Sequence, residues 1–419
     1  MTEPAVEPPP GNPRFPLFDS IRGIAVLMVV VVHGGYISGA AHGAWYGDLI
    51  ARLEFCLPIF FLVSAFLLYR PFVAARVHGR PGPDTRRFLR ARALRILPAY
   101  WVALTLLTLY PGLPQLWSDH WWAYYGFMSV YDSNWAFGGI LPAWSLCIEV
   151  TFYLALPLFA AFVMRAGGMR REWIAVGALF VAGVAFNAIV HIADGDRVDT
   201  NLYLTLPAAL HWLALGMVLA VASVALERRD EQPRVVRLVE RAPGLAWAVG
   251  AALFLFVSLG IGLNSESPHL GITVDSPESA TLFQWLAEGL LYGLIAFCLL
   301  LPAVFGDHLG GFPRAVLRNR VLGWIGLISY GIFLWHLPIM AWLANDLDTE
   351  PWGDSRMLGI TGVGLLLAIA CAAVSYYAVE RPLLRLKRPS RAAATTRSTA
   401  NATSTTKVSS AAWRKRGSP

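Results

Sequence analysis

The ionisable residues Arg22 and His33 lie eleven residues apart in one apolar segment, FDSIRGIAVLMVVVVHGGY. Eleven residues make about three helical turns, so both side chains point to nearly the same side of a helix, roughly 16 Å apart along its axis. Ionisable groups inside a membrane cost about 2.5 to 3.5 kcal/mol each for Arg, Lys or Asp, and are rarely kept without a partner or a task. The pair therefore indicates a reaction site. The alternative is structural, with Arg22 reaching lipid headgroups and His33 bonding a backbone carbonyl.

Four other ionisable residues occur in apolar segments at a depth close to that of His33: Glu149, His211, Glu288 and His336. Because an α-helix rises about 1.5 Å per residue, we expect these groups to converge on one cavity in the outer half of the membrane. A carboxylate beside an imidazole fixes its tautomer and raises its basicity, so we expect Glu149 to orient His33 as a general base for a hydroxyl. The alternative is a hydrogen-bonded network that only joins helices.

The basic segment RRFLRARALRILPAYW is a second candidate site, and it contains Arg90, Arg92 and Arg95. Several guanidinium groups crowded at the start of an apolar helix suit bidentate binding of phosphate. The alternative is that these arginines only set the topology and contact lipid headgroups. Arg22 is expected at the same side of the membrane, which favours a phosphate ligand.

The composition identifies the environment in which these residues act. Of the 419 residues, 56% are hydrophobic and only 15% charged, and the mean hydropathy is +0.52, which excludes an ordinary soluble globule. The chain is therefore expected to be an all-α polytopic membrane protein with about ten transmembrane helices. The expected spans are residues 20–38, 50–70, 94–110, 143–164, 173–192, 202–225, 243–262, 282–305, 321–344 and 357–379. The four cysteines lie in apolar segments without paired spacing, so we expect neither disulfides nor a metal site.

The loops between the spans alternate in charge. Arginines crowd loops such as 71–93 and 226–242, whereas the opposite loops are acidic, so both termini are predicted to be cytoplasmic. This asymmetry accounts for the net charge of +7 and argues against a nucleic-acid partner. We expect a disordered Pro-rich tail over 1–17, a transmembrane domain over 18–388, and a disordered basic Ser/Thr-rich tail over 389–419.

These segments together resemble the membrane acyltransferase-3 family. FDSIRGIAVLMVVVVH is similar to the family's Arg-ten-residues-His signature, and Arg92-Ala-Leu-Arg95 is similar to its Arg-x-x-Arg loop. WSLCIEVTFYL resembles the family's W-S-L-x-x-E-x-x-F-Y-L block, and CLPIFFLVSAFLL, ISYGIFLWHLP and SYYAVERPLLRL complete the set. The motifs keep the family's order from Phe18 to about Leu386.

The resemblance implies an O-acyltransferase that moves an acyl group from acyl-CoA, usually acetyl-CoA, to a hydroxyl of an envelope glycan or glycolipid, without a metal. It implies catalytic roles for Arg22, His33 and Glu149, and donor binding by Arg92 and Arg95. Arg90, from the same basic segment, is expected to bind the donor with them. His33 is then a general base or a transient acyl carrier. Many relatives have a second acid and a glutamine after the first acid, where this chain has Val150 and Thr151, so a role for paired carboxylates is not expected.

Only about forty residues follow the last expected helix, so we expect the stand-alone form without the SGNH-type domain that some relatives carry. Such a protein finishes the transfer itself or hands the acyl group to a separate partner. We expect it in the inner (plasma) membrane, and only three lysines among 34 basic residues are typical of GC-rich bacteria. The alternatives are acylation of a small hydroxylated metabolite and transport of a glycolipid, although no inverted repeat or matching pair of broken helices supports transport.

Overall fold

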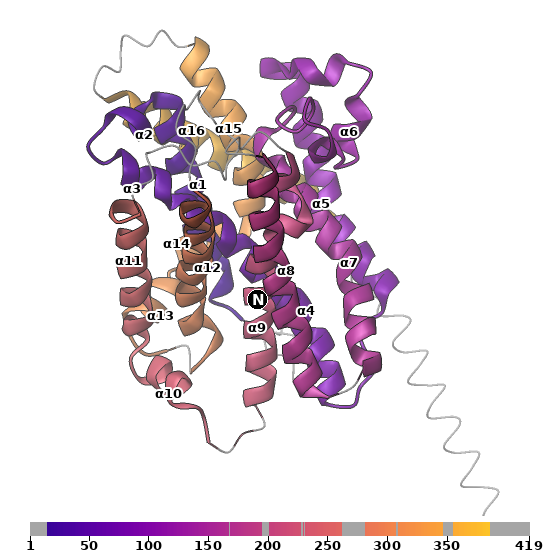
Figure 1. Ribbon diagram of the computed structural model, residues 1–419. Coiled ribbons are helices and arrows are strands. Elements are labelled where there is room, and N and C mark those ends of the chain that lie inside the picture. The colour runs from indigo at the N-terminus through magenta and orange to yellow at the C-terminus, as the bar shows by residue number, and fades with distance from the viewer. Residues whose placement is uncertain are drawn as a thin grey trace, which may run out of the picture.

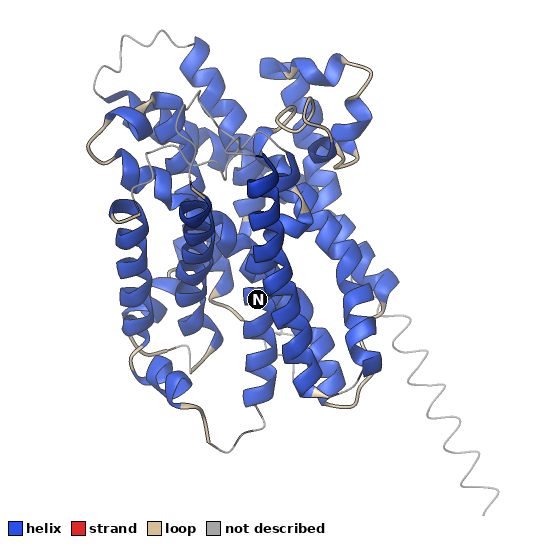
Figure 2. Cartoon of the chain, in the orientation of Figure 1, coloured by secondary structure: helices blue, strands red, loops and turns tan. Residues whose placement is uncertain are grey.

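The chain forms a bundle of long helices in a computed structural model. The structure describes residues 15–166, 168–194, 201–227, 229, 231–261, 281–306, 309–346 and 355–385. Helices and loops account for all of these residues, and none of them forms a strand (Figure 2). The tail predicted for 389–419 and the first 14 residues of the tail predicted for 1–17 lie outside the described residues.

The described elements are all helical. The first half of the chain contains α1 (Phe18–Ser38), α2 (Ala40–Gly43), α3 (Gly47–Ala51), η1 (Arg52–Phe55), α4 (Cys56–Val77), α5 (Thr85–Leu107), η2 (Thr108–Gly112), η3 (Pro114–Trp117), α6 (Trp121–Tyr125), η4 (Ser129–Tyr131), η5 (Leu141–Ala143), α7 (Trp144–Ala166) and α8 (Met169–Asp194). The second half contains η6 (Asn201–Leu204), α9 (Leu206–Leu226), α10 (Arg234–Arg241), α11 (Pro243–Leu259), α12 (Leu282–Val304), α13 (Phe312–Leu317), α14 (Arg320–Leu327), α15 (Ser329–Asp346), α16 (Arg356–Ser375), η9 (Tyr376–Glu380) and α17 (Arg381–Arg385).

Most of the long helices are apolar enough to cross a membrane. Within the described residues, eight spans meet this test by length and composition, and up to ten if each of two bent helix pairs is one span. An α-helix pairs the backbone N–H and C=O groups of such an apolar segment internally, as the hydrocarbon core of a membrane requires. The prediction of an all-α polytopic membrane protein is therefore confirmed.

One expected span is bent, and another adjoins a bend. The segment predicted at 321–344 consists of α14 and α15, which meet at an angle of 72°. The span predicted at 243–262 contains α11, and α10, in the predicted loop before it, meets α11 at 98°. At the first of these bends the Ser329 hydroxyl donates a hydrogen bond of 2.8 Å to the carbonyl of Gly326. The bend between α14 and α15 was not predicted, and it brings Ser329 and Tyr330 to the wall of a cavity.

Small residues allow the helices that carry the site to approach closely. A Cβ atom on Gly326 of α14 would lie 1.6 Å from the carbonyl oxygen of Asp19 on α1. Likewise, a Cβ on Gly216 of α9 would lie 2.4 Å from the carbonyl oxygen of Leu62 on α4. Since lipid supplies no hydrophobic drive between helices, such close backbone packing is what holds membrane helices together. The positions of α1 and α4 are thus fixed by contacts that any larger residue would block.

The two ends of the bundle differ. α2 and α6 lie at one end, and α10, which falls in the basic segment 226–242, lies at the other (Figure 1). This arrangement agrees with the alternation of acidic and basic loops along the chain. The cytoplasmic location of the basic end stays a prediction.

Candidate active site

A cavity of about 400 Å³ opens among α1, α4, α5, α7, α15 and α17. The residues around it are Arg22, Val29, Leu57, Phe60, Phe61, Ser64, Leu67, Leu68, Arg92, Arg95, Ile96, Ser145, Leu146, Glu149, Tyr153, Ser329, Tyr330, Phe333 and Leu384. We call this space the donor chamber. A concave, mostly apolar space with a few convergent polar groups is typical of a binding site.

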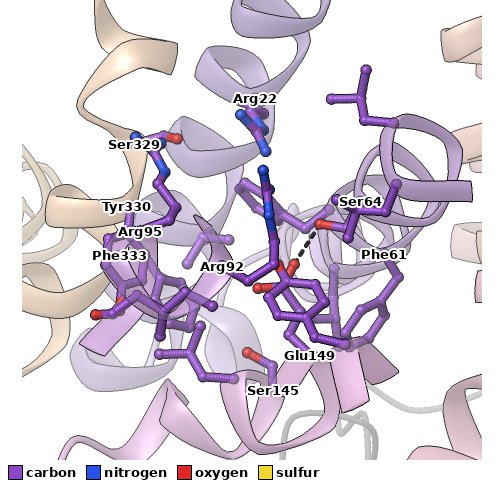
Figure 3. A pocket seen from close by; sticks show the side chains of 18 of the residues that line it. Arg22, Phe61, Ser64, Arg92, Arg95, Ser145, Glu149, Ser329, Tyr330 and Phe333 are labelled. Atoms are coloured by element: carbon purple, nitrogen blue, oxygen red, sulfur yellow. Dashed lines mark hydrogen bonds between the residues drawn. The ribbon is translucent and has the colours of Figure 1, made fainter. Parts of the chain in front are cut away.

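Three arginines from two helices line the donor chamber: Arg22 of α1, and Arg92 and Arg95 of α5 (Figure 3). Arg22 lies 3.9 Å from the half-exposed carboxylate of Asp19, and Arg95 lies 3.5 Å from the buried carboxylate of Glu380. The Nε atom of Arg92 is buried without a hydrogen-bond partner among the described residues. A buried donor without an acceptor is costly, so this cluster suits an anionic ligand with several oxygen acceptors.

Arg90 takes no part in this cluster. It is exposed on α5 and does not line the donor chamber, although the sequence favoured it as a donor-binding residue together with Arg92 and Arg95. A residue two positions before Arg92 lies on a different side of the helix, because successive residues are rotated by about 100°. The structure thus brings together two of the three arginines expected in this segment.

Glu149 lines the donor chamber as well, and it lies among the polar groups. The hydroxyl of Ser64 on α4 donates a hydrogen bond to Oε1 of Glu149 (Figure 3). The carboxylate also interacts electrostatically with Arg22, and Tyr153 interacts with Glu149, Arg92 and Arg22. The carboxylate therefore offsets part of the arginine charge, and it does not accept the hydrogen bond that was expected from His33.

The imidazole of His33 pairs with a second histidine instead. Nδ1 of His33 lies 2.9 Å from Nε2 of His336, and Nδ1 of His336 lies 3.0 Å from the carbonyl oxygen of Ile332. A carbonyl only accepts, so His336 donates through Nδ1, and its Nε2 accepts from Nδ1–H of His33. In this assignment Nε2 of His33 keeps its lone pair, and the ring also interacts with the backbone of Val29 on the same helix. The pair thus presents one basic nitrogen held in a fixed orientation.

His33 lines a second, much smaller cavity of about 20 Å³, which we call the His33 pocket. Its other walls include Cys56, Trp144 and Pro142. Four residues line both this pocket and the donor chamber: Val29, Leu57, Ser145 and Phe333. The two cavities are therefore neighbours, with the arginines around one and the imidazole in the other.

The expectation that Glu288 and His211 share the site with His33 is wrong, because neither lines the donor chamber or the His33 pocket. Glu288 accepts a hydrogen bond of 2.7 Å from Arg52 and one of 2.8 Å from Tyr292. The side chains of Arg52 and Glu288 are fully buried. The ring of His211 packs against Trp212 with centroids 4.7 Å apart. The pair of Arg52 and Glu288 joins η1 to α12 away from the site.

Sequence reasoning gave no role to several residues that the structure places at the site. Ser64, Tyr153, Phe333 and Glu380 belong to this group, as does the pairing of His336 with His33. Each lies within one of the segments that carry the family resemblance, so a polar or aromatic residue inside those motifs was the available signal. The sequence did not indicate which residue on another helix each of these residues contacts.

No group of three or more His, Cys, Asp or Glu side chains that could hold a metal ion occurs in the described part of the chain. Cys56 and Cys147 are buried free thiols, and Cys298 and Cys371 are partly buried free thiols.

Comparison with known proteins identifies the family of the chain. Residues 16–378 match the acyltransferase-3 family model, which is described as an acyltransferase domain. The chain belongs to the acyltransferase-3 family. The matched region of this acyltransferase includes all the residues that line the His33 pocket. It also includes the motifs quoted above, except the end of SYYAVERPLLRL, which continues past residue 378.

The proteins similar to this acyltransferase include three from different bacteria. The YrhL protein of Bacillus subtilis is 24% identical over 386 residues, which are 88% of this chain and 54% of that protein. The O-acetyltransferase OatA of Staphylococcus aureus is 23% identical over 394 residues, or 89% of this chain and 58% of OatA. The chain thus spans little more than half of these two proteins. Nodulation protein 10 of Rhizobium leguminosarum bv. viciae is 25% identical over 397 residues, or 88% of this chain and 93% of that protein. No solved structure matches the chain.

Proposed function

We propose that this acyltransferase moves an acetyl group from acetyl-CoA, bound from the cytoplasmic side, to a hydroxyl of a cell-envelope glycan or glycolipid at the inner membrane. The name of OatA supports acetyl transfer to oxygen. The observation that carries the proposal is the adjacency of the arginine-lined donor chamber and the His33 pocket through four shared residues. One ligand can therefore place phosphates at the arginines and a thioester at the imidazole.

The positive charge of the arginines around the donor chamber supports binding of the CoA phosphates there. Arg22, Arg92 and Arg95 face one carboxylate, Glu149, across the donor chamber, and the buried Nε of Arg92 lacks an acceptor. CoA carries several phosphate groups, and guanidinium forks bind phosphate oxygens in pairs. The arginine-rich loops adjoin this end of the bundle, and by the positive-inside rule they face the cytoplasm, where acyl-CoA is made.

The pair of His33 and His336 supports a reaction at Nε2 of His33. Nε2 of His33 accepts the proton of the acceptor hydroxyl while the hydroxyl oxygen attacks the thioester carbonyl carbon. The C–S bond then breaks, CoA leaves as the thiolate, and the proton on Nε2 passes to the sulfur, which yields the ester and CoA thiol. While His33 is protonated, its Nδ1–H bond to His336 becomes charge-assisted and stabilises the cation. A route in which Nε2 first takes the acyl group uses the same nitrogen.

The test is acyl transfer by the purified protein in liposomes supplied with acetyl-CoA labelled in the acetyl group and a cell-envelope glycan extract. We expect His33→Ala to lower the release of CoA thiol by about 10²- to 10⁴-fold, the range for loss of a general base. The matched control is His191→Ala, because His191 is also buried but lines neither cavity. Full activity of His33→Ala would refute the proposed mechanism. Absence of turnover with every acyl-CoA tried would refute the function.

A further inference from the structure

The four residues shared by the donor chamber and the His33 pocket form a neck between them: Val29 of α1, Leu57 of α4, Ser145 of α7 and Phe333 of α15. Val29, Leu57 and Ser145 are buried, and Phe333 is partly buried. The Phe333 ring also lies against His336, with centroids 6.1 Å apart. The neck is therefore built from four different helices and adjoins the histidine pair.

The space beyond the neck is small. The His33 pocket measures about 20 Å³, and a cavity needs roughly 10 to 15 Å³ on this measure to hold a single water molecule. A methyl group is close to a water molecule in size, so the pocket accepts one such group and little more. The donor chamber, at about 400 Å³, sets no comparable limit.

The reaction brings the acyl group to this narrow place. In either role of His33, the thioester carbonyl must come within reach of Nε2, and this nitrogen belongs to a ring that lines only the smaller cavity. The CoA arm fills the donor chamber on the other side of the neck. The acyl chain must therefore lie in the neck or in the His33 pocket when the carbonyl reacts.

We propose that Phe333 and Leu57 limit the acyl group to two carbons by closing the neck beside His33. This proposal rests on the proposed function and adds the structural cause of its acyl specificity. Both side chains are large and apolar, and they present no polar atom that an acyl chain could bind. Their effect is thus steric, and removing either one enlarges the space next to the imidazole without changing the arginines or the histidine pair.

The test compares kcat/KM for acetyl-, propionyl-, butyryl- and hexanoyl-CoA, measured as CoA thiol release in liposomes with the envelope glycan extract. Each methylene that a pocket must reject is worth roughly 10- to 200-fold in kcat/KM. Butyryl-CoA has two methylenes more than acetyl-CoA, so we expect the wild type to prefer acetyl-CoA by at least about 100-fold. In Phe333→Ala this ratio should fall about 10-fold or more.

The matched control is Phe60→Ala. Phe60 is another partly buried phenylalanine that lines the donor chamber but not the His33 pocket, so its loss should leave the butyryl-to-acetyl ratio unchanged. If Phe333→Ala does not fold, Leu57→Ala and the milder Phe333→Leu test the same neck.

The outcomes separate the two proposals. Equal use of acetyl-CoA and hexanoyl-CoA by the wild type overturns the proposal that the neck limits the acyl group. It leaves the proposed acyltransferase function intact. An unchanged ratio in the neck variants, or an equal change in Phe60→Ala, also overturns it. Failure of the wild type to release CoA from any of the four donors overturns the proposed function instead.

Discussion

Replacing His336 with alanine removes the acceptor for Nδ1–H of His33. The two nitrogens are 2.9 Å apart, and the exposed fractions of His33 and His336 are 3% and 0%, so water does not readily replace the lost partner. A buried donor left without an acceptor costs about 1 to 3 kcal/mol. At about 1.4 kcal/mol for each factor of ten in rate, kcat is expected to fall about 5- to 150-fold if this cost appears in the transition state. The KM for acetyl-CoA should stay unchanged, since His336 does not line the donor chamber.

The assay is the initial rate of CoA thiol release against acetyl-CoA concentration, with two further variants as controls. His336→Gln places an amide oxygen near the former Nε2 and should recover much of kcat. His336→Asn places its amide near the former Nδ1, which contacts the carbonyl of Ile332, and should not rescue. Wild-type kcat in His336→Ala would refute the argument, as would a loss confined to KM or equal rescue by both amides.

Two other substitutions test separate parts of the structure. Arg92→Ala removes a charged hydrogen bond worth about 1.5 to 3 kcal/mol and should raise the KM for acetyl-CoA about 10- to 150-fold. The control Arg90→Ala should leave this KM unchanged. Equal effects of the two variants would remove Arg92 from the donor site. Glu288→Ala leaves Arg52 buried without its carboxylate and should lower the free energy of unfolding by about 3 to 5 kcal/mol, seen as a lower denaturation temperature in detergent. Loss of the half-exposed Asp19 carboxylate in Asp19→Ala should cost less than about 1 kcal/mol, and similar values for the two variants would contradict this account.

The membrane spans could be predicted because hydrocarbon imposes one simple demand. A helix that crosses it needs about 20 apolar residues, and this demand is visible in sequence alone. The first expected span, 20–38, corresponds to α1 at Phe18–Ser38, and 282–305 corresponds to α12 at Leu282–Val304. The bend between α14 and α15 was not visible, because the apolar run continues across it. The close packing of Gly326 against Asp19 and the Ser329 hydrogen bond at this bend are contacts that only the folded chain contains.

The site was predicted in part, for a related reason. Depth along a helix follows from counting residues, and it correctly placed His336 close to His33. Counting does not determine the direction in which a side chain faces a neighbouring helix, so Glu149 and Glu288 were expected beside His33 as well. Glu149 turns toward Ser64 and the arginines instead. Glu288 pairs with Arg52, which stands at the edge of an expected span and gave no sign of being its partner. The catalytic and donor-binding roles of Arg22, His33, Glu149, Arg92 and Arg95 stay predictions.

Arg22 and His33 both belong to α1, one continuous helix from Phe18 to Ser38. The anion-binding end and the reacting nitrogen are thus set apart by the rise of a single rigid element, roughly 16 Å, and no hinge between them can change that length. Under the proposed function, α1 acts as a molecular ruler for the donor. A ligand with a phosphate and a thioester on a long enough arm would occupy both ends at once and gain the binding energy of the arginines at the moment of transfer. A short thioester without the nucleotide would lack that binding energy, so the same proposal expects the helix to select coenzyme-borne acyl groups over small free ones.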